Sequence, residues 1–171
     1  MKHKNKYSSL NKDAKYNLSI HIELDRIKIQ GDKMNKEEKV KKDFYRVAWL
    51  IEDLHKSERG IHTRLFDLLI SDEDITIDES IKGRGHREHI VPCVVIVDEA
   101  IRMYDEENAS VEQVANMMQS NLKIVHITKE EQKKVDYELK LQRKMPNGWK
   151  FGDSIFERLK KADIKLEKHN F

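Results

Sequence analysis

The sequence predicts an α+β chain that is mostly helical and carries a few short strands. Apolar side chains recur three and four residues apart in several segments, which is the spacing of a helix with one buried face. Other stretches alternate apolar and polar residues, which is the period of a strand. Several segments begin with Asn, Ser or Thr followed three residues later by Glu or Gln, a pattern that caps helix N-termini.

The composition indicates one domain with a thin core. The chain has 171 residues, of which 38% are hydrophobic and 37% are charged, whereas typical globular chains have about 45–50% apolar and about 25% charged residues. The net charge of +2 excludes a uniformly basic coat protein and a strongly acidic, disordered chain. Residues 1–35 and 129–171 each carry +4 and the middle carries −6. Both ends suit a polyanion and the middle suits cations, although chance segregation of solvated faces explains the same pattern.

The sequence favours a soluble, cytoplasmic protein without a membrane partner. Cys93 is the single cysteine, which excludes an internal disulfide framework, and its apolar surroundings favour a small buried hydrophobe over a nucleophile. No apolar run approaches the roughly 18 residues that span a bilayer. The basic first residues are not followed by the apolar stretch of a signal peptide.

The first 33 residues form a basic extension, and a well-patterned helix follows it. Alternation over 20–24 and 27–29 predicts either a short strand pair or a poorly ordered segment. Asn35 and Glu38 then cap a helix over 36–57, the clearest amphipathic pattern in the chain. The remaining predicted elements are a helix over 61–70, an acidic turn over 71–74, a short strand or ordered loop around 75–77, a glycine-marked turn at 83–85, an extended stretch up to Pro92, helices over 93–106 and 111–119, a strand over 122–127, a helix over 129–142, a turn over 145–149 and a last helix from 154 to about 163.

Two segments carry residues suited to phosphodiester hydrolysis. Glu88-His89-Ile90-Val91-Pro92 places a carboxylate and an imidazole at the start of an extended stretch, and the strand over 122–127 leads directly into the helix capped by Thr128. If the two strands pair, the start of that helix lies near Glu88 and His89. Adjacent residues point to opposite faces of a regular strand, so a site that uses both requires a bend in the strand.

The chemistry of these residues fits a metal-dependent hydrolase. A hard divalent cation needs oxygen ligands, which Glu88 supplies, and a neutral imidazole at position 89 can take a proton from water. Arg84 and Arg87 present donors for phosphate oxygens, His86 lies between them, and the helix after Thr128 adds a partial positive charge.

The two segments together resemble the HNH endonuclease family, whose fold is the ββα-metal finger. The resemblance covers about residues 83–140. It implies that His89 is the general base, that Glu88 is a metal ligand, and that Asn121 braces the finger and orients the base. The last metal position of the family falls on Gln132, with Glu130 as the alternative if the register differs by two.

The resemblance predicts a mostly helical chain around a ββα-metal finger with a helical insertion between its two strands. The expected activity is hydrolysis of DNA with Mg²⁺, or Mn²⁺, as the cofactor. Zinc is less suited, because one cysteine and scattered histidines do not make a four-ligand site. The expected partner is double-stranded DNA, and a homodimer is compatible with double-strand cleavage. The implied organisation is a basic extension at 1–33, a helical scaffold at 34–82, a nuclease core at 83–142 and a basic C-terminal helix at 143–171.

Basic residues of the finger and the C-terminal region would follow the nucleic-acid backbone: Lys129, Lys133, Lys134, Lys140, Arg143 and Lys144. Two other classes of protein remain open from the sequence. One is a non-catalytic nucleic-acid-binding protein with a degenerate finger, which the amide at position 132 favours. The other is a protein–protein regulator that uses the helix over 36–57 or the acidic turn over 71–74 as its surface.

Overall fold

The computed structural model describes residues 35–169. The basic extension at 1–33, with the strands expected at 20–24 and 27–29, lies outside the described residues. The described elements occur in the order α2 (Lys36–Lys56), α3 (Leu65–Leu69), α4 (Asp72–Ile75), β1 (Thr76–Glu79), β2 (His86–His89), α5 (Cys93–Glu107), α6 (Val111–Asn121), β3 (Ile124–Ile127), α7 (Lys129–Lys133), the π-helix η1 (Lys134–Glu138) and α8 (Glu157–Lys161).

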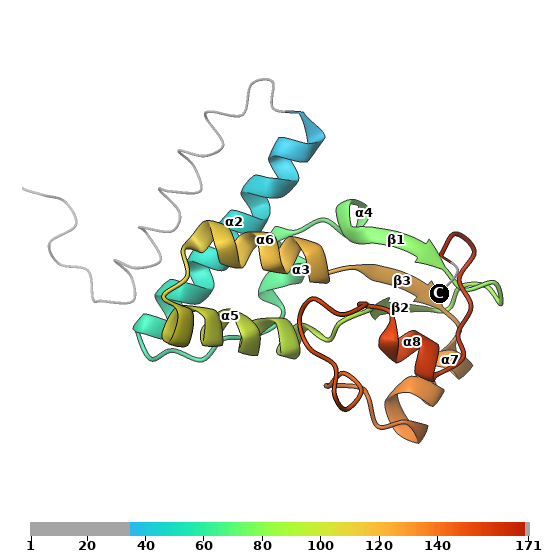
Figure 1. Cartoon of the computed structure of the whole chain (residues 1–171). Helices are drawn as coiled ribbons and strands as arrows, with labels where there is room; N and C mark the ends of the chain where they lie inside the picture. The colour runs from blue at the N-terminus through green and yellow to red at the C-terminus, as the bar shows by residue number, and fades with distance from the viewer. Residues whose placement is uncertain (1–34, 170–171) are drawn as a thin grey trace, which may run out of the picture. The chain divides into compact units, whose positions relative to one another are not determined.

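The three strands form one mixed sheet in the order β1-β3-β2 (Figure 1). β1 runs parallel to β3, and β2 runs antiparallel to β3 with four consecutive pairs from His86↔Ile127 to His89↔Ile124. The expected pairing of the two segments is therefore confirmed. The fold is a mixed α/β arrangement, as expected, in which β2 is an edge strand with a neighbour on one side only.

The position of the first strand differs from the sequence prediction. Glu88 and His89 lie at the end of β2 and not at the start of a strand over 88–92. Beyond His89 the chain makes one more backbone hydrogen bond, from the amide of Ile90 to the carbonyl of Lys123 at 2.9 Å. Pro92 is then the N-cap of α5, so the chain leaves the sheet.

Three of the predicted helices are confirmed with nearly the expected bounds. α2, α5 and α6 lie within two residues of their predicted bounds, and the capping boxes at Ser110 and Thr128 are both present. α5 and α6, which pack against each other, form the helical insertion between β2 and β3 (Figure 1).

Four other segments are shorter or different from expectation. The helix over 61–70 is reduced to α3, the acidic turn is the single helical turn α4, and the last helix is α8 alone. The helix over 129–142 is α7 followed by η1, and it ends where Lys140 adopts a left-handed φ of 55°. Glycine normally takes that conformation, so a lysine there gives no stop signal in the sequence.

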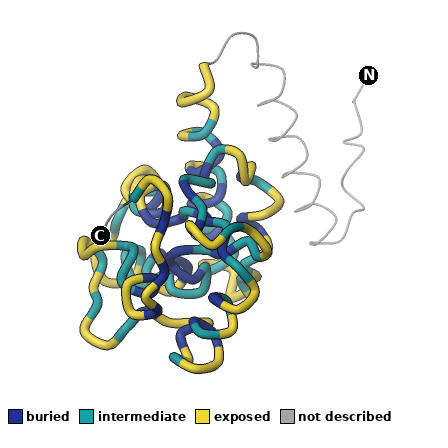
Figure 2. The backbone as a smooth tube through the Cα atoms, turned by 90° about the vertical axis from the view of Figure 1, so that its right-hand side faces the viewer, coloured by how far each residue is buried: buried dark blue, intermediate teal, exposed yellow. Residues whose placement is uncertain are grey.

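Two apolar clusters lie on either side of the sheet's central strand. The larger cluster joins α2, α3, α5 and α6 and includes the fully buried Phe44 and Ile51, and it reaches the sheet at Ile124. The smaller cluster joins Val125 and Ile127 of β3 to η1, α8 and the residues after α8. Figure 2 colours the buried residues dark blue, and they gather in the interior of the part of the chain that the structure describes. No helix within residues 35–169 is long and apolar enough to cross a membrane.

The chain after α8 returns along β1 and fastens α8 to the sheet. Leu166 forms an antiparallel bridge with Ser80, and the amide of Glu167 donates to the carbonyl of Glu79 at 3.0 Å. The buried carboxylate of Asp78 accepts hydrogen bonds from the amides of Lys168 and His169 and lies 2.7 Å from Nδ1 of the His169 ring. The C-terminal segment is thus an integral part of the fold.

Candidate functional site

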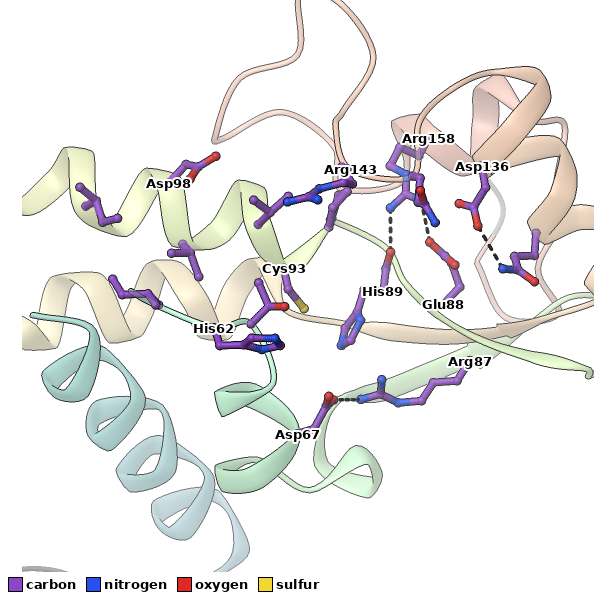
Figure 3. A pocket seen from close by; sticks show the side chains of 18 of the residues that line it. His62, Asp67, Arg87, Glu88, His89, Cys93, Asp98, Asp136, Arg143 and Arg158 are labelled. Carbon is purple, nitrogen blue, oxygen red and sulfur yellow. Dashed lines mark hydrogen bonds and ion pairs between the residues drawn. The ribbon is translucent and has the colours of Figure 1, made fainter. Parts of the chain in front are cut away.

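A cavity of about 790 Å³ opens along the free edge of β2 (Figure 3). Its walls come from the end of α2, the segment before α3, β2, the start of α5, the α7–η1 helix and α8. The lining includes five of the residues that the sequence analysis singled out for the site: His86, Arg87, Glu88, His89 and Gln132.

The carboxylate of Glu88 is buried between the guanidinium of Arg158 and the imidazole of His86. Nη2 of Arg158 donates to Oε1 of Glu88 at 2.6 Å, and Nε2 of His86 lies 3.1 Å from Oε2. His86 and Glu88 share one face of β2 because alternate residues of a strand point the same way. Burial raises the pKa of Glu88 above its usual range, against the opposing effect of Arg158, and the nearby charge of Asp136 raises it further.

The imidazole of His89 lies on the other face of β2. In Figure 3 the ring faces Cys93 and His62, whereas the Glu88 carboxylate faces Arg158 and Asp136. Nε2 of His89 is buried and has no hydrogen-bond partner among the described residues. Burial lowers the pKa of His89 to about 4, and the charge of Arg87 acts in the same direction. The ring is therefore neutral at physiological pH and has an unprotonated nitrogen, and the lowered pKa makes it a weaker base than a free imidazole.

The expected bend in the strand is not needed. All four pairs between β2 and β3 are in register, so Glu88 and His89 do point to opposite faces. Both still line one cavity because β2 is an edge strand, and the cavity passes around its free edge. If β2 lay in the middle of the sheet, a second neighbouring strand would separate its two faces, and Glu88 and His89 could not line one cavity.

The helix after β3 contributes an amide and a carboxylate. Nε2 of Gln132 donates to Oδ2 of Asp136 at 3.0 Å, and both side chains line the cavity. Asp136 belongs to the π-helix η1, a form that is rare and recurs at functional sites. Glu130, the alternative to Gln132, is exposed and lies outside the cavity lining. Glu131 is a capping residue, since it accepts from the amide of Thr128 and from the hydroxyl of Ser80.

Asn121 lies apart from this cavity. Its side chain donates to the carbonyl oxygen of Met117 at 2.8 Å, within α6, and it does not line the cavity. The structure therefore places Asn121 as the last residue of a helix, outside the set of residues that line the cavity with His89.

Most of the side chains expected to bind phosphate either have carboxylate partners or lie outside the cavity. Arg87 donates to Asp67 at 2.9 Å and to Asp72, and Arg84 donates to Glu79, so carboxylates already hold both guanidinium groups. Lys129 and Lys133 are exposed and lie outside the cavity lining. Arg143 is exposed, lines the cavity and has no carboxylate partner among the residues that the structure describes.

Two site residues were missed by the sequence analysis. Asp136 stands four residues after Gln132, a spacing that places both on one helix face, so helical periodicity could have found it. Arg158 stands 70 residues after Glu88, and no local pattern links the two. Arg143 was expected only as one of several backbone-following cations.

The donor set suits a cation that keeps much of its water. Within residues 35–169, no group of three His, Cys, Asp or Glu side chains is arranged to hold a metal ion. Mg²⁺ binds through one or two carboxylates together with water and substrate phosphates, and it does not require a complete protein cage. Glu88 and Asp136, with the amide oxygen of Gln132, are compatible with such a site.

Comparison with known protein families, with curated proteins and with solved structures finds no match for this chain.

Proposed function

We propose that this chain is a metal-dependent, HNH-like endonuclease that hydrolyses phosphodiester bonds in DNA. The observation that carries the proposal is the shared cavity: β2 pairs with β3, β3 leads into the capped helix α7, and Glu88, His89 and Gln132 from these elements line one space. This strand–strand–helix order is the one expected of a ββα-metal finger, here with α5 and α6 inserted between the strands.

His89 is the proposed general base. A buried polar atom without a partner requires an explanation, and a water molecule or substrate oxygen in the cavity would satisfy Nε2 of His89. The neutral ring would take a proton from the water that attacks phosphorus, the bond from phosphorus to the leaving deoxyribose oxygen would break, and that oxygen would gain a proton from solvent.

A divalent cation, Mg²⁺ or Mn²⁺, would be held by Glu88 and Gln132, with Asp136 as a further oxygen donor. When bound it would polarise the phosphate and stabilise the leaving oxygen. Arg143 would contact a phosphate at the cavity rim, because its guanidinium is exposed there. His86 and Arg87 line the walls and complete the polar surroundings of the phosphate.

One observation favours a second candidate, a nucleic-acid-binding protein that does not cleave. Both oxygens of Glu88 have side-chain partners, the guanidinium of Arg158 on one and the imidazole of His86 on the other. A carboxylate engaged in this way binds a metal only if the cation displaces the His86 ring or shares an oxygen. In the non-catalytic protein the Glu88–Arg158 pair would be structural, and the cavity would hold a phosphate without hydrolysing it.

A cleavage assay on supercoiled plasmid separates the two candidates. Wild type is compared with His89→Ala in Mg²⁺ or Mn²⁺, with and without chelator, and His126→Ala serves as the matched control because His126 lies on β3 outside the cavity lining. We expect metal-dependent nicking or linearisation by wild type and His126→Ala, and none by His89→Ala. Cleavage by His89→Ala at the wild-type rate would refute the assigned base. Binding without cleavage by wild type would establish the second candidate.

A further inference from the structure

A buried guanidinium from the last helix joins both proposed site residues of β2. Arg158 in α8 is 1% exposed. Its Nη2 donates to Oε1 of Glu88 at 2.6 Å, and its Nη1 donates to the carbonyl oxygen of His89 at 3.0 Å and lies 3.5 Å from that of Ile90. Figure 3 shows the two shorter contacts as dashed lines from Arg158. One side chain thus binds a carboxylate and two consecutive backbone carbonyls.

The contacts fall where β2 has least support from the sheet. β2 is an edge strand, and its ladder ends at His89. The Ile90 amide donates to the carbonyl of Lys123, just before β3, and this is the last hydrogen bond to that segment before the backbone enters α5. A rotation of this strand end would move Glu88 and His89 together, because they are adjacent on one backbone.

We propose that Arg158 is a positioning residue that fixes the end of β2, and with it the carboxylate of Glu88 and the imidazole of His89, relative to the cavity. The planar guanidinium presents its donors in a fixed fork, so it can hold all three acceptors at once, which a lysine ammonium cannot do with the same geometry. The effect on cleavage rests on the proposed function, whereas the effect on the strand end does not.

The helix that carries Arg158 is itself held in place by packing and by the chain that follows it. Leu159, next to Arg158, is fully buried in the smaller apolar cluster, and the chain after α8 is bound to β1 through Asp78 and Ser80. The backbone of Arg158 is therefore held in a fixed position. Through the guanidinium of Arg158, the C-terminal segment determines where the end of β2 lies.

The first test measures the strand end without using cleavage. Arg158→Lys, Arg158→Met and the matched control Lys161→Met, which alters an exposed residue of the same helix, are compared by residue-resolved amide hydrogen exchange and by the NMR signals of the His89 ring. We expect exchange at the Ile90 amide to be at least about 10-fold faster in Arg158→Met than in Lys161→Met, with α5 and α6 unchanged, and the His89 ring signals to shift. If Arg158→Met does not fold, Arg158→Lys carries the test with a smaller change in the same direction.

The second test separates positioning from folding. For Arg158→Lys we expect kcat to fall about 100-fold while KM stays within about twofold, since small misplacements of reacting groups lower the rate without weakening binding. A purely structural role would instead reduce the folded fraction and leave the rate per folded molecule unchanged.

The outcomes distinguish this inference from the proposed function. Unchanged exchange at Ile90 and unchanged His89 signals in both Arg158 variants would overturn the positioning role, whatever the cleavage result. Absence of cleavage by wild type would overturn the proposed nuclease, and the exchange measurement would still decide the role of Arg158.

Discussion

Gln132 donates from Nε2 to Oδ2 of Asp136 at 3.0 Å, one helical turn further along the chain. The bond directs the amide NH₂ of Gln132 to the carboxylate, so the amide oxygen is not the atom used in this contact. It also holds Asp136 at the wall of the cavity, near enough to Glu88 for its charge to raise the pKa of Glu88. The weak ligand proposed at position 132 is in this way accompanied by a carboxylate, that of Asp136.

Asp136→Asn tests whether that carboxylate supports the proposed metal site. We expect cleavage to fall at least about 10-fold and the Mg²⁺ concentration for half-maximal activity to rise, because one negative charge near the cation is removed. Glu138→Gln is the control, since it removes an exposed charge from the same π-helix. An unchanged metal titration in Asp136→Asn would remove Asp136 from the site.

Arg143→Ala tests the proposed phosphate contact at the cavity rim. We expect weaker binding to a DNA duplex at all sequences, and a plot of log Kd against log salt whose slope falls by about one. Arg102→Ala gives the same change in net charge, but its guanidinium is bound by Glu99 and Glu107 on α5. Equal effects of the two variants on the salt slope would show that only net charge matters.

Asp78→Asn tests the attachment of the C-terminal segment. Although burial acts to raise the pKa of Asp78, the hydrogen bonds from His169 and from the amides of Glu79, Lys168 and His169 outweigh it and lower the pKa below its usual value of 3.8. A carboxylate with a lowered pKa in the folded state stabilises the fold above its unfolded pKa, and that stability is lost as the pH falls through the folded value.

We therefore expect Asp78→Asn to lower the free energy of unfolding by about 1–3 kcal/mol at pH 7 and by much less at pH 3. Urea denaturation at several pH values measures both. Asp163→Asn is the control, because Asp163 is exposed and asparagine tolerates its left-handed φ of 54°. Equal destabilisation by Asp78→Asn at pH 7 and pH 3 would contradict the linkage.

Cys93 should be unreactive in the folded protein although it lines the cavity. Burial raises the pKa of its thiol to about 12, so the nucleophilic thiolate is scarce at pH 8. We expect a disulfide reagent to modify Cys93 at least about 100-fold more slowly in the native protein than in urea. Labelling of the native protein as fast as in the unfolded protein would show that the thiol is exposed by local opening.

The sequence by itself determined the elements whose signals are local. The apolar spacing of α2, the capping boxes at Ser110 and Thr128 and the extended stretch that ends at Pro92 place helix ends within a few residues, because each depends on neighbours along the chain. The sequence placed Glu88, His89 and Gln132 near one another on the condition that the two strands pair, and the pairing of β2 with β3 meets that condition.

Only the tertiary structure decided which atoms surround those residues. It made β2 an edge strand, so that two opposite faces open to one cavity, and it left the Asn121 side chain bound within α6, outside the cavity lining. It also brought Arg158 to Glu88 from 70 residues further along the chain. Such contacts are set by how α8 and the C-terminal segment pack on the sheet, and packing over long separations leaves no periodic trace in the sequence.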